Sequence, residues 1–328
     1  MGGIFMIHAV TKNKQNESVL HEVLQKAFGK ECSIGDEIIE MDGGFCNAVY
    51  QAEVDGSGYI IKIAPPPNVL MMGYEKNMME TEVEMLHLVR EQTTVPVPNV
   101  VFYDDSCAIC DSPYFIMTKV EGETLLAAKE QLSKEEYEHI QQVVGGYNRQ
   151  INSILGKEFS LPGRKDMRHA TLAPFVMELF DLLLEDGKKV ESDLQHIDYE
   201  EVYEILHKYK WVFEEVKTPQ LVHWDLWEGN IFIKEKEVCG IIDFERCLWS
   251  DPLMEHEFSG FGPVGESFLS GYEEGKVLTE TEAIRSELYR LYRILSSVIE
   301  CNFRNYGEDW MYRFSCEELK KLLVRVEF

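Results

Sequence analysis

A stretch of 25 residues, Leu221 to Glu245, constrains the fold more than any other part of this chain. It reads LVHWDLWEGNIFIKEKEVCGIIDFE, and its polar residues interrupt apolar runs that have the pattern of short strands. Asp225 and Asp243 each follow such a run, and Asn230 lies between them. Strands would hold the two carboxylates rigidly, so the stretch predicts a site where both act on one bound ligand.

The segment HWDLWEGN, which begins at His223, fits H-x-D-L-x-x-x-N, the spacing of a phosphoryl-transfer catalytic loop. The carboxylate of Asp225 can orient a hydroxyl nucleophile and take its proton. The amide oxygen of Asn230 can bind a metal while its NH2 group braces the loop. Asp243, eighteen residues after Asp225, can reach a Mg²⁺ that bridges the β- and γ-phosphates. The alternatives are a surface turn with a helix cap for the loop and an ordinary strand-end turn for Asp243.

The first 120 or so residues of the chain read as an antiparallel sheet with a helix inserted after its third strand. An amphipathic helix is expected over residues 18–29, strands separated by glycine turns over 37–64, and the inserted helix over 74–92. Two further strands are expected between Val97 and Gly122. The rest of the chain reads mostly as helices, one of which starts with a capping box at Ser133 and Glu136.

Lys62 lies on the predicted third strand, and its neighbours Ile61 and Ile63 point to the opposite face. Kinases place at this position the lysine that pairs with the α- and β-phosphates, and a helix carboxylate fixes it. Glu82 stands four and seven residues before two apolar positions of the inserted helix, so we expect it to face inward. The alternatives are a solvated edge lysine and a solvated acidic helix face.

Three weaker signals also point to the nucleotide site. Gly43 and Gly44 lie at a strand-to-strand turn, where glycines let backbone N–H groups approach phosphate, although two glycines in a hairpin usually mark only a turn. Asn47 is either a turn-bracing residue or a phosphate contact. The backbone from Thr118 to Val120 is expected to pair with an adenine edge, or else to be an ordinary edge strand.

Composition limits the class of partner. The 328 residues are 45% hydrophobic, which suits a folded protein of two lobes. The net charge of -26 opposes binding to nucleic acid or to an anionic membrane and is compatible with a cationic ligand. The eight cysteines contain one C-x-x-C pair, Cys107 and Cys110, without the second pair that a zinc ribbon needs. With no basic leader, no long apolar run and no sign of an obligatory protein partner, we expect a cytoplasmic protein.

Taken in order, these segments resemble the aminoglycoside phosphotransferase and choline kinase superfamily of protein-kinase-like small-molecule kinases. The resemblance rests on HWDLWEGNIFI, GIIDFE, GGFCNAVY, ETEVEMLHLV and YFIMTKVEGETL. It implies an α+β fold with a nucleotide-binding lobe over residues 1–119 and a larger, mainly helical catalytic and substrate-binding lobe over 120–328. It also implies transfer of the γ-phosphoryl group of ATP, with Mg²⁺, to a hydroxyl of a small, amine-bearing molecule.

Carried over by position, the resemblance makes Asp225 the catalytic base and Asn230 and Asp243 the metal ligands. Lys62 becomes the phosphate lysine with Glu82 as its partner. His223 braces the loop. The chain departs from the family where Trp224 replaces a small residue and where Glu255 replaces a common aspartate, which we interpret as a variant brace.

Three functions remain open: a small-molecule kinase, a nucleotide-binding pseudokinase or regulatory module, and a protein kinase. A protein substrate is disfavoured because only seven residues separate Asp243 from Asp251. The acceptor is not fixed, and neither is the choice between ATP and GTP. An acidic rim for a polycation would use Glu255, Glu257, Glu266, Glu273 and Glu274. An aromatic cage for a quaternary ammonium would use Trp227, Trp249, Tyr289, Tyr292 and Trp310. Solvated glutamates and ordinary core aromatics explain these sets equally well.

Overall fold

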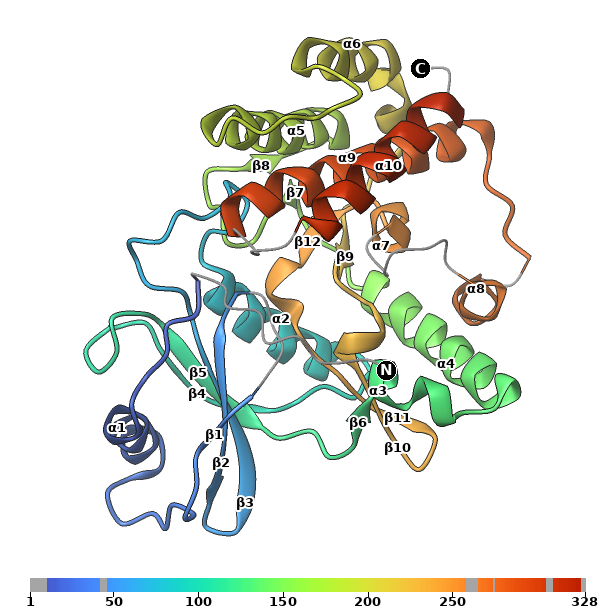
Figure 1. Ribbon diagram of the computed structural model, residues 1–328. Coiled ribbons are helices and arrows are strands. Elements are labelled where there is room, and N and C mark those ends of the chain that lie inside the picture. The colour runs from blue at the N-terminus through green and yellow to red at the C-terminus, as the bar shows by residue number, and fades with distance from the viewer. Residues whose placement is uncertain (1–10, 42–45, 258–264, 274, 305–308, 326–328) are drawn as a thin grey trace.

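The computed structural model describes residues 11–41, 46–257, 265–273, 275–304 and 309–325. Its N-terminal part is an antiparallel five-stranded sheet with the order β1-β2-β3-β5-β4 (Figure 1). The strands are β1 Ile39–Glu40, β2 Ala48–Val54, β3 Ser57–Ile63, β4 Val100–Asp104 and β5 Tyr114–Thr118. The turn from β2 to β3 is Asp55-Gly56, and both residues have positive φ, of 50° and 77°. Paired positive φ values match the twist of a tight hairpin, which fixes the register of these strands.

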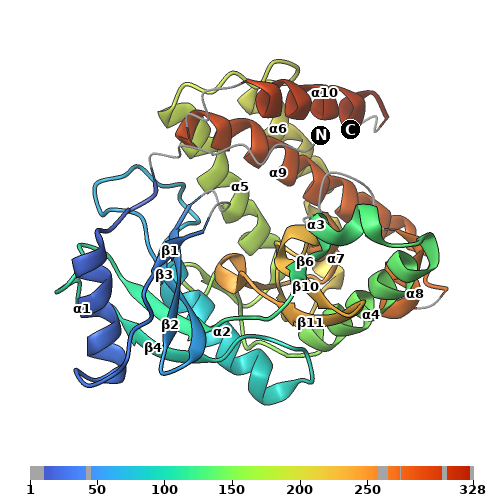
Figure 2. The same ribbon diagram turned by 60° about the horizontal axis from the view of Figure 1, so that its bottom comes forward.

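One helix covers each face of this sheet (Figures 1 and 2). Helix α1 (Glu17–Phe28) buries Leu20, Val23 and Leu24 against the face that carries Ile61 and Ile63. Helix α2 (Met78–Gln92) packs on the opposite face, against Phe115 and Met117 of β5. Alternation along β3 therefore points Lys62 toward α2, as its sequence neighbours predict.

Helix α2 starts later than the sequence suggests. We expected helix from Tyr74, but Asn77 has a left-handed φ of 51° and the helix begins at Met78. Residues 73–77 instead bond to the C-terminal part of the chain. The N–H of Gly73 donates to Asp186 at 2.5 Å, and the Nδ2 of Asn77 donates to the backbone oxygen of Gly163 at 2.9 Å. These contacts outweigh the helical preference of the segment.

The chain leaves the sheet through Gly122. Its φ of 129° favours glycine, and there is also no room for a side chain, because an added Cβ would lie 2.4 Å from the oxygen of Ile233. The C-terminal part is mainly helical, as expected, and its helices α5, α6, α9 and α10 gather at the top of Figure 1. The helices are α3 Leu125–Ala128, α4 Lys134–Asn152, α5 Leu172–Lys189, α6 Tyr199–Tyr209, α7 Leu253–Glu257, α8 Glu266–Glu273, α9 Glu280–Arg304 and α10 Trp310–Arg325. The predicted capping box at Ser133 and Glu136 starts α4.

Two small sheets lie within this helical part. One has the order β11-β10-β6 and the other β8-β7-β12-β9. Their strands are β6 Glu123–Thr124, β7 Phe159–Ser160, β8 Arg168–His169, β9 Gln220–Val222, β10 Ile231–Lys234, β11 Glu237–Ile241 and β12 Leu248–Ser250. The motif stretch thus runs from β9 through the hairpin of β10 and β11, which gives both aspartates the strand support that the sequence indicates. Among the described residues, no helix is long and apolar enough to cross a membrane.

Candidate active site

Lys62 lies at the centre of a cluster of carboxylates. Its Nζ is 2.6 Å from the Oε2 of Glu82 on α2 and 3.1 Å from the Oε2 of Glu245, and it also bonds to Asp243. Lys62 is 6% exposed and Glu82 is 1% exposed. The structure therefore brings together Lys62, Glu82 and Asp243, which are far apart in the sequence and were each singled out from it.

Three carboxylates around one ammonium leave an excess of negative charge. Burial opposes the charge on Lys62, but Asp243, Glu245 and Glu82 more than offset it and raise the lysine pKa well above its usual range. Burial raises the pKa of Glu82 to about 8. Burial also acts upward on Asp243, but the contact with Lys62 lowers the pKa of that carboxyl. A divalent cation would relieve the excess charge.

Carboxylate oxygens of Glu82, Asp243 and Glu245 lie within 4.8 Å of one another. Oxygen ligands at this spacing fit Mg²⁺, which takes one or two carboxylates together with substrate phosphates. Asp243 has a left-handed φ of 72° at the start of the short 3₁₀ helix η4 (Phe244–Arg246), and this turn follows β11 directly. Glu245 is a member of the cluster that the sequence did not identify as a site residue. The sequence feature that could have identified Glu245 is its position two residues after Asp243, near the end of a predicted strand.

The predicted catalytic loop starts where β9 ends at Val222, and hydrogen bonds on both ring nitrogens hold its histidine in place. The Nε2 of His223 bonds to the backbone oxygen of Ile242 at 3.0 Å, and its Nδ1 accepts the N–H of Asp225 at 3.2 Å. His223 is fully buried, and burial lowers its pKa to about 4. A neutral ring with both nitrogens bonded ties the loop to the end of β11, which fits the predicted bracing role.

Asp225 and Asn230 are in direct contact, in the short 3₁₀ helix η3 (Glu228–Asn230) and the turn before it. The Nδ2 of Asn230 donates to the backbone oxygen of Asp225 at 2.9 Å and to its Oδ2 at 3.1 Å. Burial raises the pKa of Asp225 to about 8, and the positive charge of Arg246 is the largest effect that lowers it. The Oδ1 of Asn230 makes no hydrogen bond to a described residue, so this oxygen remains available to a metal.

Glu255 supports this loop from within the protein core. Its carboxylate accepts the backbone N–H of His223 at 2.7 Å and that of Trp224 at 2.9 Å. Glu255 is fully buried. The interpretation of Glu255 as a brace fits these bonds, and its assignment to an acidic acceptor rim is wrong because the residue does not reach the surface. Glu266 and Glu273 are exposed on α8, whereas the side chains of Glu257 and Glu274 lie outside what the structure describes.

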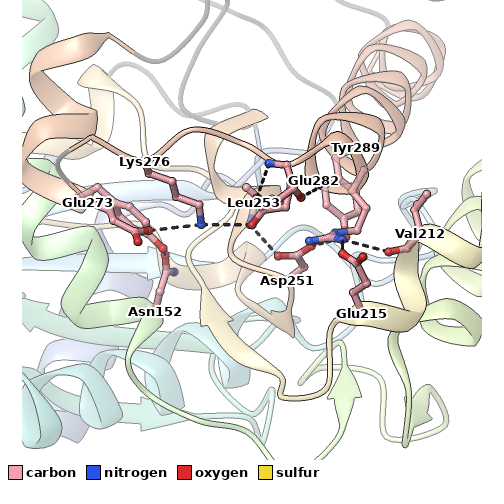
Figure 3. Close-up of polar contacts among 12 residues, drawn as sticks. Asn152, Val212, Glu215, Asp251, Leu253, Glu273, Lys276, Glu282 and Tyr289 are labelled. Carbon is pink, nitrogen blue, oxygen red and sulfur yellow. Dashed lines mark hydrogen bonds and ion pairs between the residues drawn. The ribbon is translucent and has the colours of Figure 1, made fainter.

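The segment that carries Glu255 is anchored in turn by Asp251. The Oδ2 of Asp251 accepts bonds from the Nε of Arg285 and from the hydroxyl of Tyr289, both at 2.9 Å, as Figure 3 shows for Tyr289. Tyr289 and Tyr292 are buried at 0% and 2% exposure, so these two residues belong to the core and the predicted aromatic cage is wrong for them. Trp227 and Trp249 are half-buried, and Trp310 is 56% exposed on α10.

The other residues predicted to contact the nucleotide differ in what the structure shows of them. Gly43 and Gly44 lie outside the described residues. The Nδ2 of Asn47 donates to Glu245 at 2.5 Å, which links the start of β2 to the cluster. Thr118 bonds to Asn99 through both its N–H and its hydroxyl, at 2.9 Å each. The backbone groups of Val120 make no hydrogen bond within the described part of the chain.

The chain is similar to several known proteins in sequence and in fold. A probable ketoamine kinase of Vibrio parahaemolyticus is 24% identical over 276 residues, covering 81% of this chain and 86% of the relative. A crystal structure of a Haemophilus somnus 129PT protein classed as a fructosamine-3-kinase has a TM-score of 0.67 at 17% identity. It covers 93% of this chain and 96% of its own.

A gentamicin complex of the aminoglycoside phosphotransferase APH(2")-IIa has a TM-score of 0.62 at 17% identity, covering 94% of this chain and 97% of the other. At such identities the solved structures establish the fold, which is kinase-like. The model of the phosphotransferase enzyme family known as APH matches residues 37–314, well over half of the sequence, and the chain belongs to that family.

Proposed function

We propose that this protein is an ATP-dependent kinase that transfers the γ-phosphoryl group to a hydroxyl of a small molecule. The convergence of Lys62, Glu82 and Asp243 with the Asp225–Asn230 pair is the observation that carries the proposal. Residues 1–119 form the nucleotide lobe in this proposal, and residues 120–328 supply the catalytic loop and the acceptor site.

Each residue then has one task. Asp225 accepts the proton of the acceptor hydroxyl while the acceptor oxygen forms its bond to the γ-phosphorus. The bond from that phosphorus to the β–γ bridging oxygen breaks, and ADP leaves with the electron pair. Lys62, fixed by Glu82, pairs with the α- and β-phosphates. Gly43 and Gly44 contact the phosphates. Within the predicted stretch from Thr118 to Val120, the backbone of Val120 contacts the adenine edge, since the N–H groups of Thr118 and Lys119 already bond to Asn99 and Gly58.

Asn230 and Asp243 would hold Mg²⁺, and Glu245 lies within reach of the same ion. When bound, the ion neutralises charge on the β- and γ-phosphates. The free Oδ1 of Asn230 and the excess of carboxylates around Lys62 support this assignment. ATP as the donor is supported by a structural relative, APH(4)-Ia, solved with AMP-PNP and hygromycin B, which has a TM-score of 0.62.

We propose an amine-bearing, hydroxyl-rich acceptor, because the relatives are named for ketoamines, fructosamines and aminoglycosides. A protein acceptor is opposed by the segment after Asp243. There the chain passes directly into η4 and into β12, which is paired with β7 and β9. No free activation segment lies between Asp243 and Asp251 in this described stretch.

ADP release from Mg-ATP tests the proposal against a panel of ketoamines, fructosamines, aminoglycosides, choline, ethanolamine, homoserine and methylthioribose. Asp225→Asn should retain nucleotide binding and lose about 10²–10⁴ in turnover, the usual contribution of a general base. Turnover within a few fold of the wild type in this variant would refute the base assignment. Failure of the wild type to bind Mg-ATP would refute the kinase assignment as a whole.

A further inference from the structure

Arg246 is a charged residue of this site that the proposed mechanism does not use. It ends η4, three residues after Asp243, and its side chain is 21% exposed. Its Nη2 lies 3.3 Å from the Oε1 of Glu300 on α9. Its guanidinium carbon lies 5.6 Å from the centre of the Tyr74 ring. The guanidinium is thus held by an anion and by an aromatic face from two separate segments.

The partners of Arg246 are themselves fixed. Glu300 also contacts the Nε of Arg304 at 3.5 Å, and Arg304 pairs with Glu75 in an ion pair whose two side chains are fully buried. The Tyr74 ring packs edge-on against the indole of Trp224, with 6.0 Å between ring centres. Residues from the loop before α2, from the catalytic loop and from α9 therefore share in orienting one guanidinium.

This orientation leaves most of the guanidinium donors unused. Only Nη2 makes a hydrogen bond to a described residue, so the N–H groups of Nε and Nη1 are open. The guanidinium also lies near the catalytic loop, because the Tyr74 ring contacts both Arg246 and the indole of Trp224, and Trp224 directly precedes the proposed base Asp225. A small cavity adjoins this position and is lined by Tyr74, Glu245, Arg246 and Cys247, among others.

We infer that Arg246 is an oxyanion-binding residue of this active site. Its open N–H groups donate hydrogen bonds to an anionic group beside Asp225, and Glu300 and Tyr74 are its positioning residues. A guanidinium fork suits phosphate or carboxylate oxygens, and one that is already fixed requires no reorganisation when charge develops. The oxyanion is either the phosphoryl group in transfer or an anionic group of the acceptor. The inference rests on the proposed kinase function.

Mg-ADP binding with and without aluminium fluoride, which mimics the phosphoryl group in transfer, tests this directly. The wild type should bind Mg-ADP more tightly when aluminium fluoride is present. If the phosphoryl group is the oxyanion, Arg246→Gln should lose roughly tenfold or more of that tightening and about 10²–10³ of the ATP hydrolysis rate. Binding of Mg-ADP alone should stay within about twofold, because no ground-state contact is removed.

The second source gives a different pattern. If the acceptor supplies the anion, Arg246→Gln should keep the aluminium fluoride effect and the hydrolysis rate. The KM for the acceptor found in the panel should then rise about tenfold or more with little change in kcat. Arg246→Lys, which keeps the charge but loses the fork, should recover part of either loss. If Arg246→Gln does not fold, the same measurements are made on Arg246→Lys.

Arg313→Gln is the matched control, since the side chain of this arginine on α10 is 75% exposed and its ion pair within the described part of the chain is with Asp309. It should change none of these quantities. Unchanged aluminium fluoride tightening together with unchanged acceptor KM in the Arg246 variants would overturn the inference and leave the kinase function intact. Loss of Mg-ADP binding itself would also overturn it, because Arg246 would then be structural. A wild type with neither ATP turnover nor aluminium fluoride tightening would refute the proposed function.

Discussion

Glu255 accepts a 2.9 Å hydrogen bond from the backbone N–H of Trp224, the residue directly before the proposed catalytic base Asp225. The same buried carboxylate accepts the N–H of His223, so one side chain holds the backbone at the start of the catalytic loop. The position of the base thus depends on the carboxylate of Glu255, which lies 32 residues after His223 and 31 residues after Trp224. Keeping that charge away from water has a cost, which pH should reveal.

Burial raises the pKa of Glu255 above its ordinary value of 4.5, although the two backbone hydrogen bonds act in the opposite direction. The folded protein therefore holds this proton to higher pH than the unfolded chain does. The stabilising contribution is complete below about pH 4.5 and is lost as the pH rises through the folded-state pKa.

We expect the unfolding free energy of the wild type, minus that of Glu255→Gln, to decrease as the pH rises above about 4.5. Glutamine cannot titrate and offers one acceptor oxygen, so the variant should also be less stable by about 1–3 kcal/mol at neutral pH. Urea denaturation at several pH values measures both effects. A difference that grows with pH would mean that the hydrogen bonds outweigh burial.

Local pattern was enough to predict the parts of the site that follow strand alternation and loop spacing. The Lys62–Glu82 pair was predictable because alternation along β3 fixes the face of Lys62 and helical spacing fixes that of Glu82. Asp225 and Asn230 lie five residues apart in one loop, so their contact follows from the motif.

Contacts between distant segments were not predictable in this way. Glu75 pairs with Arg304, 229 residues away. No periodic pattern relates two such residues, since a loop and a helix end meet only after the whole chain has folded. Of the two interpretations of Glu255, the brace fits and the acidic rim failed for the same reason: a single glutamate carries no sequence signal of burial.

Trp224 combines a strained backbone with a well-packed side chain. Its φ is 63°, and its indole stacks on Tyr292 with 5.6 Å between ring centres and is 1% exposed. Trp224→Gly would relieve about 1–2 kcal/mol of left-handed backbone strain but lose about 3–5 kcal/mol of buried aromatic packing. We therefore expect a net loss of about 1–4 kcal/mol in the free energy of unfolding.

Glu235→Gly is a matched control, because Glu235 also has a left-handed φ, of 52°, but is exposed in the turn between β10 and β11. Its stability should stay within about 1 kcal/mol of the wild type. Denaturant titration of both variants measures the contrast. Equal effects of the two substitutions would show that the Trp224 side chain adds nothing to the core.

Asp243→Ala should remove the effect of Mg²⁺ on nucleotide binding. In the wild type we expect Mg²⁺ to tighten ATP binding roughly tenfold or more, because the ion links protein carboxylates to the phosphates. Without Asp243 the Kd for ATP should be nearly the same with Mg²⁺ and with EDTA. Asp105→Ala, at an exposed position, should behave like the wild type. Persistent Mg²⁺ tightening in Asp243→Ala would exclude Asp243 as a ligand.

The ion pair of Glu75 and Arg304 joins the loop before α2 to the end of α9, and both side chains are fully buried. Removing one partner leaves an uncompensated buried charge, so Glu75→Gln or Arg304→Met alone should cost about 3–5 kcal/mol. The double variant leaves neither of these two charges behind. Its loss of unfolding free energy should be smaller than the sum of the two single losses, by a coupling energy of about 1–3 kcal/mol. Arg304 also contacts Glu300, so its single variant should be the more damaging of the two.

Urea denaturation of the four proteins at one pH gives the coupling directly. Strictly additive losses would mean that the two charges do not depend on each other, and the loop would then be held by its other bonds, such as that from Gly73 to Asp186. A large coupling has a functional consequence as well. Since Arg304 contacts Glu300, which holds Arg246, loosening the pair should lower kcat more than it weakens ATP binding if the phosphoryl group is the oxyanion, because Glu300 orients the guanidinium proposed to bind it.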